Sequence, residues 1–175
     1  MALDPRSYEL VVIDFQEKLF AAMPEPQRER AKRAAENVVY LARELGMPVT
    51  FTEQYPQGLG PTLGSLGAND PFIKSAFAAT DEPGFAARLH GRTPILVGME
   101  THICVAHTAA GLRASGVDVV VVHDACVSRG DADWEAGVAW MRQLGATMLP
   151  SETILFGLLG RATGPLFKEV SRRIR

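Results

Sequence analysis

Short apolar segments alternate along the chain with longer segments in which apolar residues recur at helical spacing. Residues 8–14 form a β-branched run that ends at an acidic residue. This pattern predicts a buried strand that presents Asp14 at its carboxyl end. Residues 27–45 carry apolar side chains on one helical face and end at Gly46, which predicts a long helix with a glycine cap.

The same alternation continues to the end of the chain. Further strands are predicted over residues 47–52, 93–97, 118–123 and 146–149. Further helices are predicted over residues 84–90, 104–114, 132–144, 152–159 and 164–173. Regular alternation of strands and helices is typical of βαβ units. We therefore predict an α/β fold in which residues 1–175 form a single domain, with three layers (α/β/α) around a mainly parallel sheet.

Polar residues follow several of these predicted strands. Ligands of parallel α/β sheets bind at the carboxyl ends of the strands, so these residues are expected at one edge. They are Asp14, Glu53, Gln54, the METHIC segment at 99–104, and His123 with Asp124. Residues 55–71 are rich in Gly and Pro, which predicts a long loop at the same edge.

Cys104 is the principal candidate for chemistry. It is predicted in the first turn of a helix that is entered from a strand through a tight turn at Gly98. The helix dipole and the free amides there would lower the pKa of the thiol, and the amides could hold an oxyanion. Asp14 is a candidate base, and Lys74 could keep it ionised and oriented. The alternative is that Cys104 is a small buried packing residue.

Three segments resemble the signatures of the isochorismatase-like cysteine hydrolases. They are VVIDFQEKL at 11–19, the lysine within FIKSAF at 72–77, and GMETHICV at 98–105. TEQYPQGLGPT at 52–62 and SETILFGLLGRATGPLFKEV at 151–170 are similar to an isochorismatase-domain subgroup whose members often lack an assigned substrate. The resemblance implies a Rossmann-like sheet topology. It also implies hydrolysis of a small molecule, in our interpretation at an amide bond and through a thioester.

The resemblance also implies roles for individual residues. Asp14, Lys74 and Cys104 would form a catalytic triad. A cis peptide bond would precede Glu100, and the backbone amides of Glu100 and Cys104 would form the oxyanion hole. Apart from the resemblance, closeness in sequence to the triad or to strand exits makes Phe15, Leu19, Gln54, Tyr55 and Phe77 candidates for the substrate pocket, with ordinary packing as the alternative for Leu19 and Phe77. Glu53 either bonds the backbone near the site or is a solvated loop residue.

A metal is not expected. Nicotinamidases of this superfamily resemble a pattern in which an Asp and two His after the second strand bind a metal. The corresponding segment here reads TEQYPQG, and no histidine lies between Gly46 and His90. We therefore expect no metal, no other cofactor and no nicotinamidase activity. Cys104 also argues against hydrolysis of isochorismate itself, which in that branch proceeds without a cysteine nucleophile.

The composition of the chain limits the classes of molecule that it is expected to bind. The formal net charge of −2 provides no basic field for nucleic acid, so we expect a small-molecule substrate and no nucleic-acid partner. No apolar run is long enough to cross a bilayer and no secretory signal is evident, so we expect no membrane partner and a cytoplasmic protein. Homo-oligomers are common in the family that the chain resembles, so we expect a dimer or larger.

Two other classes of function remain open. The chain could be a catalytically idle oligomeric scaffold, although the set of Asp14, Lys74 and Cys104 argues against it. It could be a thiol redox sensor with Cys126 as the resolving cysteine, although Cys126 is more typical of packing. Asp124 and Arg129 could pair with each other or cap a turn. The apolar helix near 152–159 is expected to pack on the sheet or on another subunit.

Overall fold

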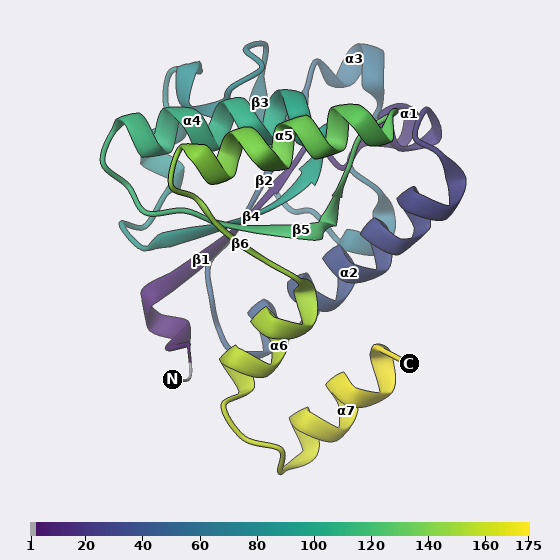
Figure 1. Ribbon diagram of the computed structural model, residues 1–175, viewed down its shortest axis with the longest axis vertical. Helices are drawn as coiled ribbons and strands as arrows, with labels where there is room; N and C mark the ends of the chain where they lie inside the picture. Colours follow the sequence, from purple (N-terminus) through teal and green to yellow (C-terminus); the bar gives the residue numbers. More distant parts are fainter. Residues whose placement is uncertain (1–2) are drawn as a thin grey trace.

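Six parallel strands form the centre of the structure, a computed structural model that describes residues 3–175 (Figure 1). The strands are β1 (Tyr8–Ile13), β2 (Val49–Gln54), β3 (Phe72–Lys74), β4 (Thr93–Met99), β5 (Val120–Val127) and β6 (Thr147–Leu149). Their order is β3-β2-β1-β4-β5-β6, and every neighbouring pair is parallel. The predicted parallel sheet and its Rossmann-like topology are confirmed.

Helices cover both faces of the sheet and complete the predicted three layers (Figure 1). One face carries α2 (Glu25–Glu44) and α6 (Ser151–Leu159), and the other carries α4 (Ala106–Ala114) and α5 (Asp131–Gln143). The remaining helices are the short α1 (Glu17–Ala21) and α3 (Pro56–Leu59), and α7 (Pro165–Arg173), which contacts α2 and α6. None of the helices within residues 3–175 is both long and apolar enough to span a membrane.

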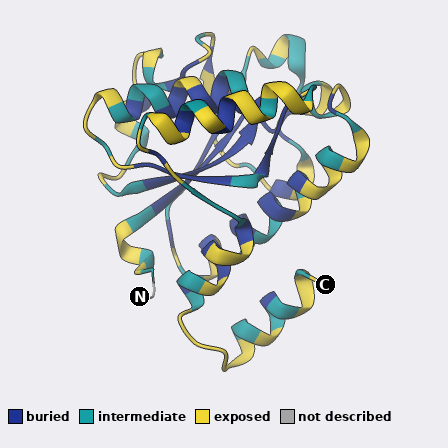
Figure 2. Cartoon of the chain, viewed as in Figure 1, coloured by how far each residue is buried: buried dark blue, intermediate teal, exposed yellow. Residues whose placement is uncertain are grey.

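The core lies on both faces of the sheet because successive side chains of a strand point in opposite directions. In β1, Leu10 and Val12 belong to the cluster beneath α2 and α6, whereas Val11 and Ile13 belong to the cluster beneath α4 and α5. All four side chains are buried. Most of the central sheet is coloured as buried in Figure 2. Burying each such side chain contributes about 1.5–3 kcal/mol, so a continuous apolar run is stable only as a central strand.

Several strands differ from the prediction. β2 runs over Val49–Gln54, so Glu53 and Gln54 are its last residues and do not follow it. β3 is a three-residue edge strand that pairs Gln54 with Lys74, and it was missed because so short a segment shows no period. β5 continues to Val127, so His123 and Asp124 lie within the strand and not at its exit. The Asp124 carboxylate accepts hydrogen bonds from the backbone N–H and the hydroxyl of Ser151 and so caps the start of α6.

The predicted loop at 55–71 has more structure than its composition indicates. It contains α3 and a 3₁₀ turn over Gly64–Leu66. The Glu53 carboxylate accepts hydrogen bonds from the N–H and the hydroxyl of Thr62 at 2.7 and 2.8 Å, which settles its open role as a backbone anchor. The helix predicted at 84–90 is a 3₁₀ turn over Phe85–Arg88.

The apolar helix near the C-terminus packs against the body of the chain. Ile154, Leu155 and Leu158 of α6 are buried in the same cluster as α2 and the sheet. Phe156 lies on the outer side of α6, 39% exposed, and its ring contacts that of Phe167 in α7 at a centroid distance of 6.2 Å. The sequence left two partners possible for this helix, the sheet or another subunit. The apolar face of α6 packs against α2 and the sheet.

The strand order places a topological switch point between β1 and β4. From β1 the chain moves outward through β2 to β3, and then returns to β4 on the other side of β1. Connections therefore leave the carboxyl ends of β1 and β4 in opposite directions, and ligands of open α/β sheets bind at such a point. Asp14 follows β1, and Glu100 and Cys104 follow β4.

Gly98 allows β4 to lie close to β1 at this switch point. It lies within β4 and not in a tight turn as predicted, with a φ of +145°. A Cβ atom at Gly98 would collide with the backbone carbonyl oxygen and the Cβ of Ile13. Backbone on both sides of the contact belongs to central strands, so neither side can move away without disturbing the sheet.

Gly98→Ala is expected to lower the free energy of unfolding by about 2 kcal/mol more than Gly116→Ala, measured by urea denaturation. Gly116 is a matched control because its φ is +77° while nothing lies within 4 Å of a Cβ there. Both variants carry the strain of a left-handed alanine, but only Gly98→Ala adds a collision. Equal losses in the two variants would contradict the close approach of β4 to β1.

Candidate active site

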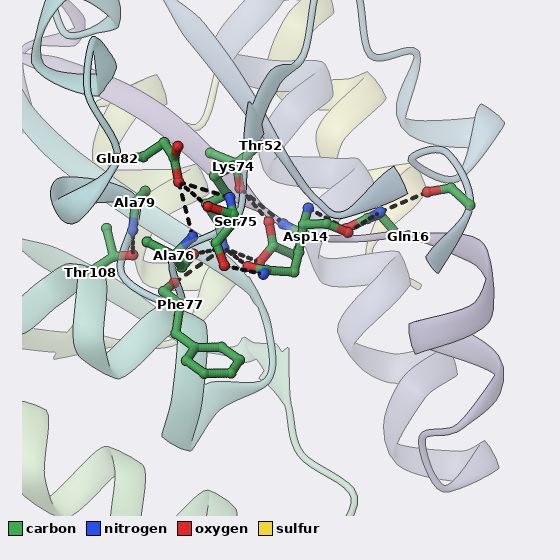
Figure 3. A network of polar contacts seen from close by, with 12 residues as sticks. Asp14, Gln16, Thr52, Lys74, Ser75, Ala76, Phe77, Ala79, Glu82 and Thr108 are labelled. Atoms are coloured by element: carbon green, nitrogen blue, oxygen red, sulfur yellow. Dashed lines mark hydrogen bonds and ion pairs between the residues drawn. The ribbon is translucent and has the colours of Figure 1, made fainter. Parts of the chain in front are cut away.

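Asp14 is held at the exit of β1 by the neighbouring strand. Its φ of +49° is a left-handed conformation, which Asp adopts more readily than most residues. Its backbone N–H donates to the carbonyl oxygen of Thr52 at 3.2 Å. Its Oδ1 accepts a hydrogen bond of 2.6 Å from the Thr52 hydroxyl (Figure 3). The carboxylate therefore has a fixed direction before any substrate is bound.

Lys74, the last residue of β3, is the counter-charge to Asp14. Its Nζ lies 2.7 Å from Asp14 Oδ2, and both side chains are 0% exposed. Nζ also donates hydrogen bonds to Gln54 Oε1 and, at 3.1 Å each, to the carbonyl oxygens of Ala76 and Phe77 (Figure 3). These contacts offset the desolvation of a buried ammonium and a buried carboxylate.

Cys104 lies in a π-helical turn over Thr101–Val105, and α4 begins only at Ala106. The predicted first helical turn is therefore wider than an α-helical one. The carbonyl oxygen of Glu100 accepts hydrogen bonds from the N–H groups of Ile103 and Val105, at 3.1 and 3.2 Å, and so closes this turn. The Cys104 side chain is buried, with 5% exposure. The peptide bond between Met99 and Glu100 is cis, as the resemblance implies.

The structure reverses the predicted direction of the thiol pKa. Burial raises the pKa of Cys104, and the negative charge of Asp14 raises it further; Lys74 opposes both, and the result is about 12. The sequence indicated a helix start, whose dipole lowers a thiol pKa, but it did not show the burial or the neighbouring carboxylate. Cys104 is therefore a neutral thiol beside an ionic pair, which makes Asp14 available as its proton acceptor.

Asp14 follows β1, Lys74 is the last residue of β3, and Cys104 lies in the turn after β4. The family model of the isochorismatase domain matches residues 9–153. The chain belongs to the isochorismatase domain family. Membership of this family supports hydrolase activity.

Relatives with this domain match almost the whole chain. The isochorismatase domain-containing protein 2 of Bos taurus is 38% identical and that of Xenopus laevis 39%, each over 98% of this chain and 84% or 85% of the relative. The MAR1 ribonuclease structure from Caenorhabditis elegans has a TM-score of 0.88 and 34% identity, over 99% of this chain and 92% of that one. YcaC of Escherichia coli, described as an octameric hydrolase of unknown specificity, has a TM-score of 0.85 and 24% identity, over 93% and 84%, which shows the shared fold.

The residues predicted to line a pocket lie in different places. Phe15 is fully buried in the core, and Leu19 packs against the same cluster, so packing accounts for both. Gln54 accepts from Lys74 and donates its amide to the carbonyl oxygen of Ser75, so it orients the lysine. Tyr55 and Phe77 are each 62% exposed. The Phe77 ring points away from the polar network that its carbonyl oxygen joins (Figure 3).

Several contacts at the site were not predicted from the sequence. Thr52 pairs with Ile13 in the sheet, and only this register brings its hydroxyl to Asp14. Arg129 does not pair with Asp124; its backbone N–H and Nε both donate to the Glu100 carboxylate. The sequence offered one indication that Arg129 lies near the site, which is that it follows a predicted strand by several residues.

A large cavity lies apart from these residues. It has a volume of about 760 Å³ between α2, the end of β5, the start of α5 and the last residues of the chain. Its walls carry both signs of charge, with Arg30, Arg33 and Arg173 facing Asp131 and Glu135, and Cys104 is not among its lining residues. Within residues 3–175, no group of three or more His, Cys, Asp and Glu side chains is arranged to hold a metal ion.

Asp14→Asn is expected to increase the rate at which iodoacetamide alkylates Cys104 at pH 8. The carboxylate raises the pKa of this thiol, so its neutralisation lowers the pKa and increases the thiolate fraction. Lys74→Met is expected to decrease the rate, because the lysine lowers the same pKa. Peptide mass spectrometry would measure modification at Cys104 separately from Cys126.

Asp118→Asn is the control for this measurement, since Asp118 is an exposed carboxylate paired with Arg113. Circular dichroism would confirm that each variant is folded. Changes of the same sign in Asp14→Asn and Lys74→Met would contradict the electrostatic coupling of the three groups.

Proposed function

We propose that the chain is a cysteine-dependent hydrolase that cleaves a C–N amide bond of a small molecule through a thioester. The observation that carries this proposal is the fully buried ion pair of Asp14 and Lys74, whose charges act directly on the thiol of Cys104. The pair lies at the switch point where the connections after β1 and β4 leave in opposite directions. A buried ionisable set at such a position is typical of a catalytic site.

The reaction begins with a neutral thiol. Asp14 accepts the proton of Cys104 as the sulfur attacks the carbonyl carbon, and a tetrahedral oxyanion forms. The backbone N–H groups of Glu100 and Cys104 donate hydrogen bonds to this oxyanion. Asp14 then gives its proton to the leaving amine, the C–N bond breaks, and the thioester remains. Water, deprotonated by Asp14, hydrolyses the thioester and regenerates the thiol.

Lys74 has an electrostatic role in this scheme. Asp14 alternates between the carboxylate and the carboxylic acid, and Lys74 stabilises the carboxylate at the start and end of each half-reaction. The hydrogen bonds from Lys74 to Gln54, Ala76 and Phe77 keep its ammonium in place while Asp14 is neutral. The group that leaves need not be ammonia, because nothing in these steps depends on its size.

The redox alternative is less well supported by the thiols. Cys104 and Cys126 pack in the same buried cluster on the α4 and α5 side of the sheet. Burial raises the pKa of Cys126 to about 12, as it raises that of Cys104. The redox alternative needs Cys126 as a reactive resolving thiol, and Cys126 is buried with a raised pKa. A scaffold, for its part, has no need of the buried charges of Asp14 and Lys74.

A small molecule suits the site better than RNA, although a structural relative from Caenorhabditis elegans is described as a ribonuclease. RNA binding rests on rows of Lys and Arg that neutralise phosphates. The lysine of this site is fully buried and already bound to Asp14. The net charge of the whole chain is −2.

Cys104→Ala is expected to abolish amide hydrolysis, with a loss of about a thousandfold or more in kcat. Ammonia release from a panel of small primary amides would measure the activity, and mass spectrometry of the quenched wild-type reaction would detect the thioester on Cys104. Cys126→Ala is the matched control because it removes the other buried cysteine, and it is expected to keep the activity.

Two results would contradict this proposal. One is equal activity in Cys104→Ala and the wild type. The other is cleavage of single-stranded RNA by the wild type, in a parallel assay, without hydrolysis of any amide in the panel.

We also propose that the chain forms a homo-oligomer in which a second copy covers the region around β3. Tyr55, Ile73 and Phe77 are large apolar side chains that are at least half exposed, and all three flank Lys74 in the structure. Light scattering coupled to size-exclusion chromatography should give a dimer or larger for the wild type and a smaller species for Ile73→Asp. A monomeric wild type at micromolar concentration would contradict this proposal.

A further inference from the structure

The Glu100 side chain is a buried carboxylate at the edge of the candidate site. It is 5% exposed, and its partner is Arg129, which follows the end of β5. The Arg129 backbone N–H donates to Oε2 at 3.0 Å, and its Nε donates to Oε1 and Oε2 at 3.2 and 3.1 Å. The Arg129 side chain itself is 61% exposed. An otherwise buried charge is therefore balanced by one residue that reaches it from the surface.

The backbone of Glu100 belongs to the turn that carries Cys104. Its carbonyl oxygen accepts hydrogen bonds from Ile103 and Val105, one on each side of the cysteine. Glu100 is thus held at two points, by Arg129 through its side chain and by the π-helical turn through its carbonyl oxygen. Its backbone nitrogen is bonded to the same Cα atom that carries both anchored groups.

The same turn has two further contacts from β5 and α5. The hydroxyl of Ser128, which precedes Arg129, lies 3.0 Å from Nδ1 of His102. Gly137 of α5 lies so close to His102 that an added Cβ would be 2.7 Å from its Cα. Of the contacts that Arg129, Ser128 and Gly137 make with this turn, the one from Arg129 is between charged groups. Its removal would leave the buried Glu100 carboxylate with only the Arg129 N–H as partner, and a carboxylate in that state moves toward water.

We propose that Arg129 is a positioning residue that holds Glu100 so that its backbone N–H points at the forming oxyanion. Oxyanion donors act at about 2.7–3.1 Å, and a misplacement of about 1 Å can reduce a rate about a hundredfold. Charge-assisted hydrogen bonds to both carboxylate oxygens restrict the direction of a side chain more than a single bond does. This inference rests on the proposed function, since an oxyanion forms only if Cys104 attacks a carbonyl carbon.

The pKa of the Cys104 thiol is set by groups other than Arg129. Burial, Asp14 and Lys74 are the causes of the pKa shift of Cys104, and Arg129 is not among them. Arg129 should therefore matter for a reaction that forms an oxyanion and not for one that needs only the sulfur nucleophile. Two reagents make this distinction at the same atom.

The first reagent is 4-nitrophenyl acetate. The Cys104 sulfur attacks its carbonyl carbon through an oxyanion, the S–C bond forms, the C–O bond to the aryl group breaks, 4-nitrophenolate leaves, and Asp14 takes the thiol proton. The second is iodoacetamide. Its methylene carbon bonds to the sulfur of the thiolate as iodide leaves, the thiol proton having gone to the solvent, and no oxyanion forms.

Arg129→Ala is expected to slow acylation of Cys104 by 4-nitrophenyl acetate about tenfold or more, while alkylation by iodoacetamide stays within about twofold of the wild type. Nitrophenolate release and mass spectrometry of the Cys104 peptide would measure the two rates. Arg172→Ala is the matched control, since Arg172 is an exposed arginine paired with Glu169 at 2.8 Å. It should leave both rates unchanged. Arg129→Lys, which can return one charged donor to Glu100, should recover part of the acylation rate.

The outcomes separate this inference from the proposed function. If acylation and alkylation fall together in Arg129→Ala, or if acylation is as fast as in Arg172→Ala, the positioning role is wrong and the proposed function stands. If the wild type is not acylated at Cys104 at all, the proposed function and this inference fail together. A selective loss of acylation with partial recovery by lysine supports the inference.

Discussion

The Asp14 carboxylate and the Lys74 ammonium lie 2.7 Å apart with neither side chain exposed to water. Two such charges are stable in a protein interior only when each also has hydrogen-bond partners of fixed geometry. Thr52 supplies one for Asp14, and Gln54 with two backbone carbonyl oxygens supplies those for Lys74. The edge strand β3 and the turn after it are therefore required by the charge they surround, as much as by any apolar contact.

This ion pair also determines how Cys104 can react. A thiol at a helix start is commonly activated as a thiolate, but here burial and the neighbouring carboxylate raise its pKa to about 12. The chemistry then depends on transfer of a proton to Asp14 during attack and not on a thiolate formed beforehand. Asp14 is suited to that task because its contacts with Thr52 and Lys74 hold the carboxyl group in place when it gains or loses a proton.

Sheet order brings the parts together. β1 and β4 are neighbours although about eighty residues separate them in sequence, and their connections leave in opposite directions. Gly98 keeps the two strands close, and Arg129, which follows the end of β5, reaches back to the turn that carries Cys104. Each of these contacts joins residues that are distant in sequence, so the candidate site is assembled only in the complete sheet.

The fold class follows from the sequence alone, because apolar runs of strand length alternating with amphipathic helices pack stably only as a layered parallel sheet. The same pattern locates Asp14 and Cys104 after buried strands, which is enough to make both of them candidates for chemistry. Four other features depend on the folded chain: the β3 strand, the anchor of Asp14 on Thr52, the Arg129–Glu100 pair and the direction of the Cys104 pKa. They arise from residues that are distant in sequence and from the exclusion of water. Local patterns carry no record of such contacts, since burial and charge proximity are properties of the assembled fold.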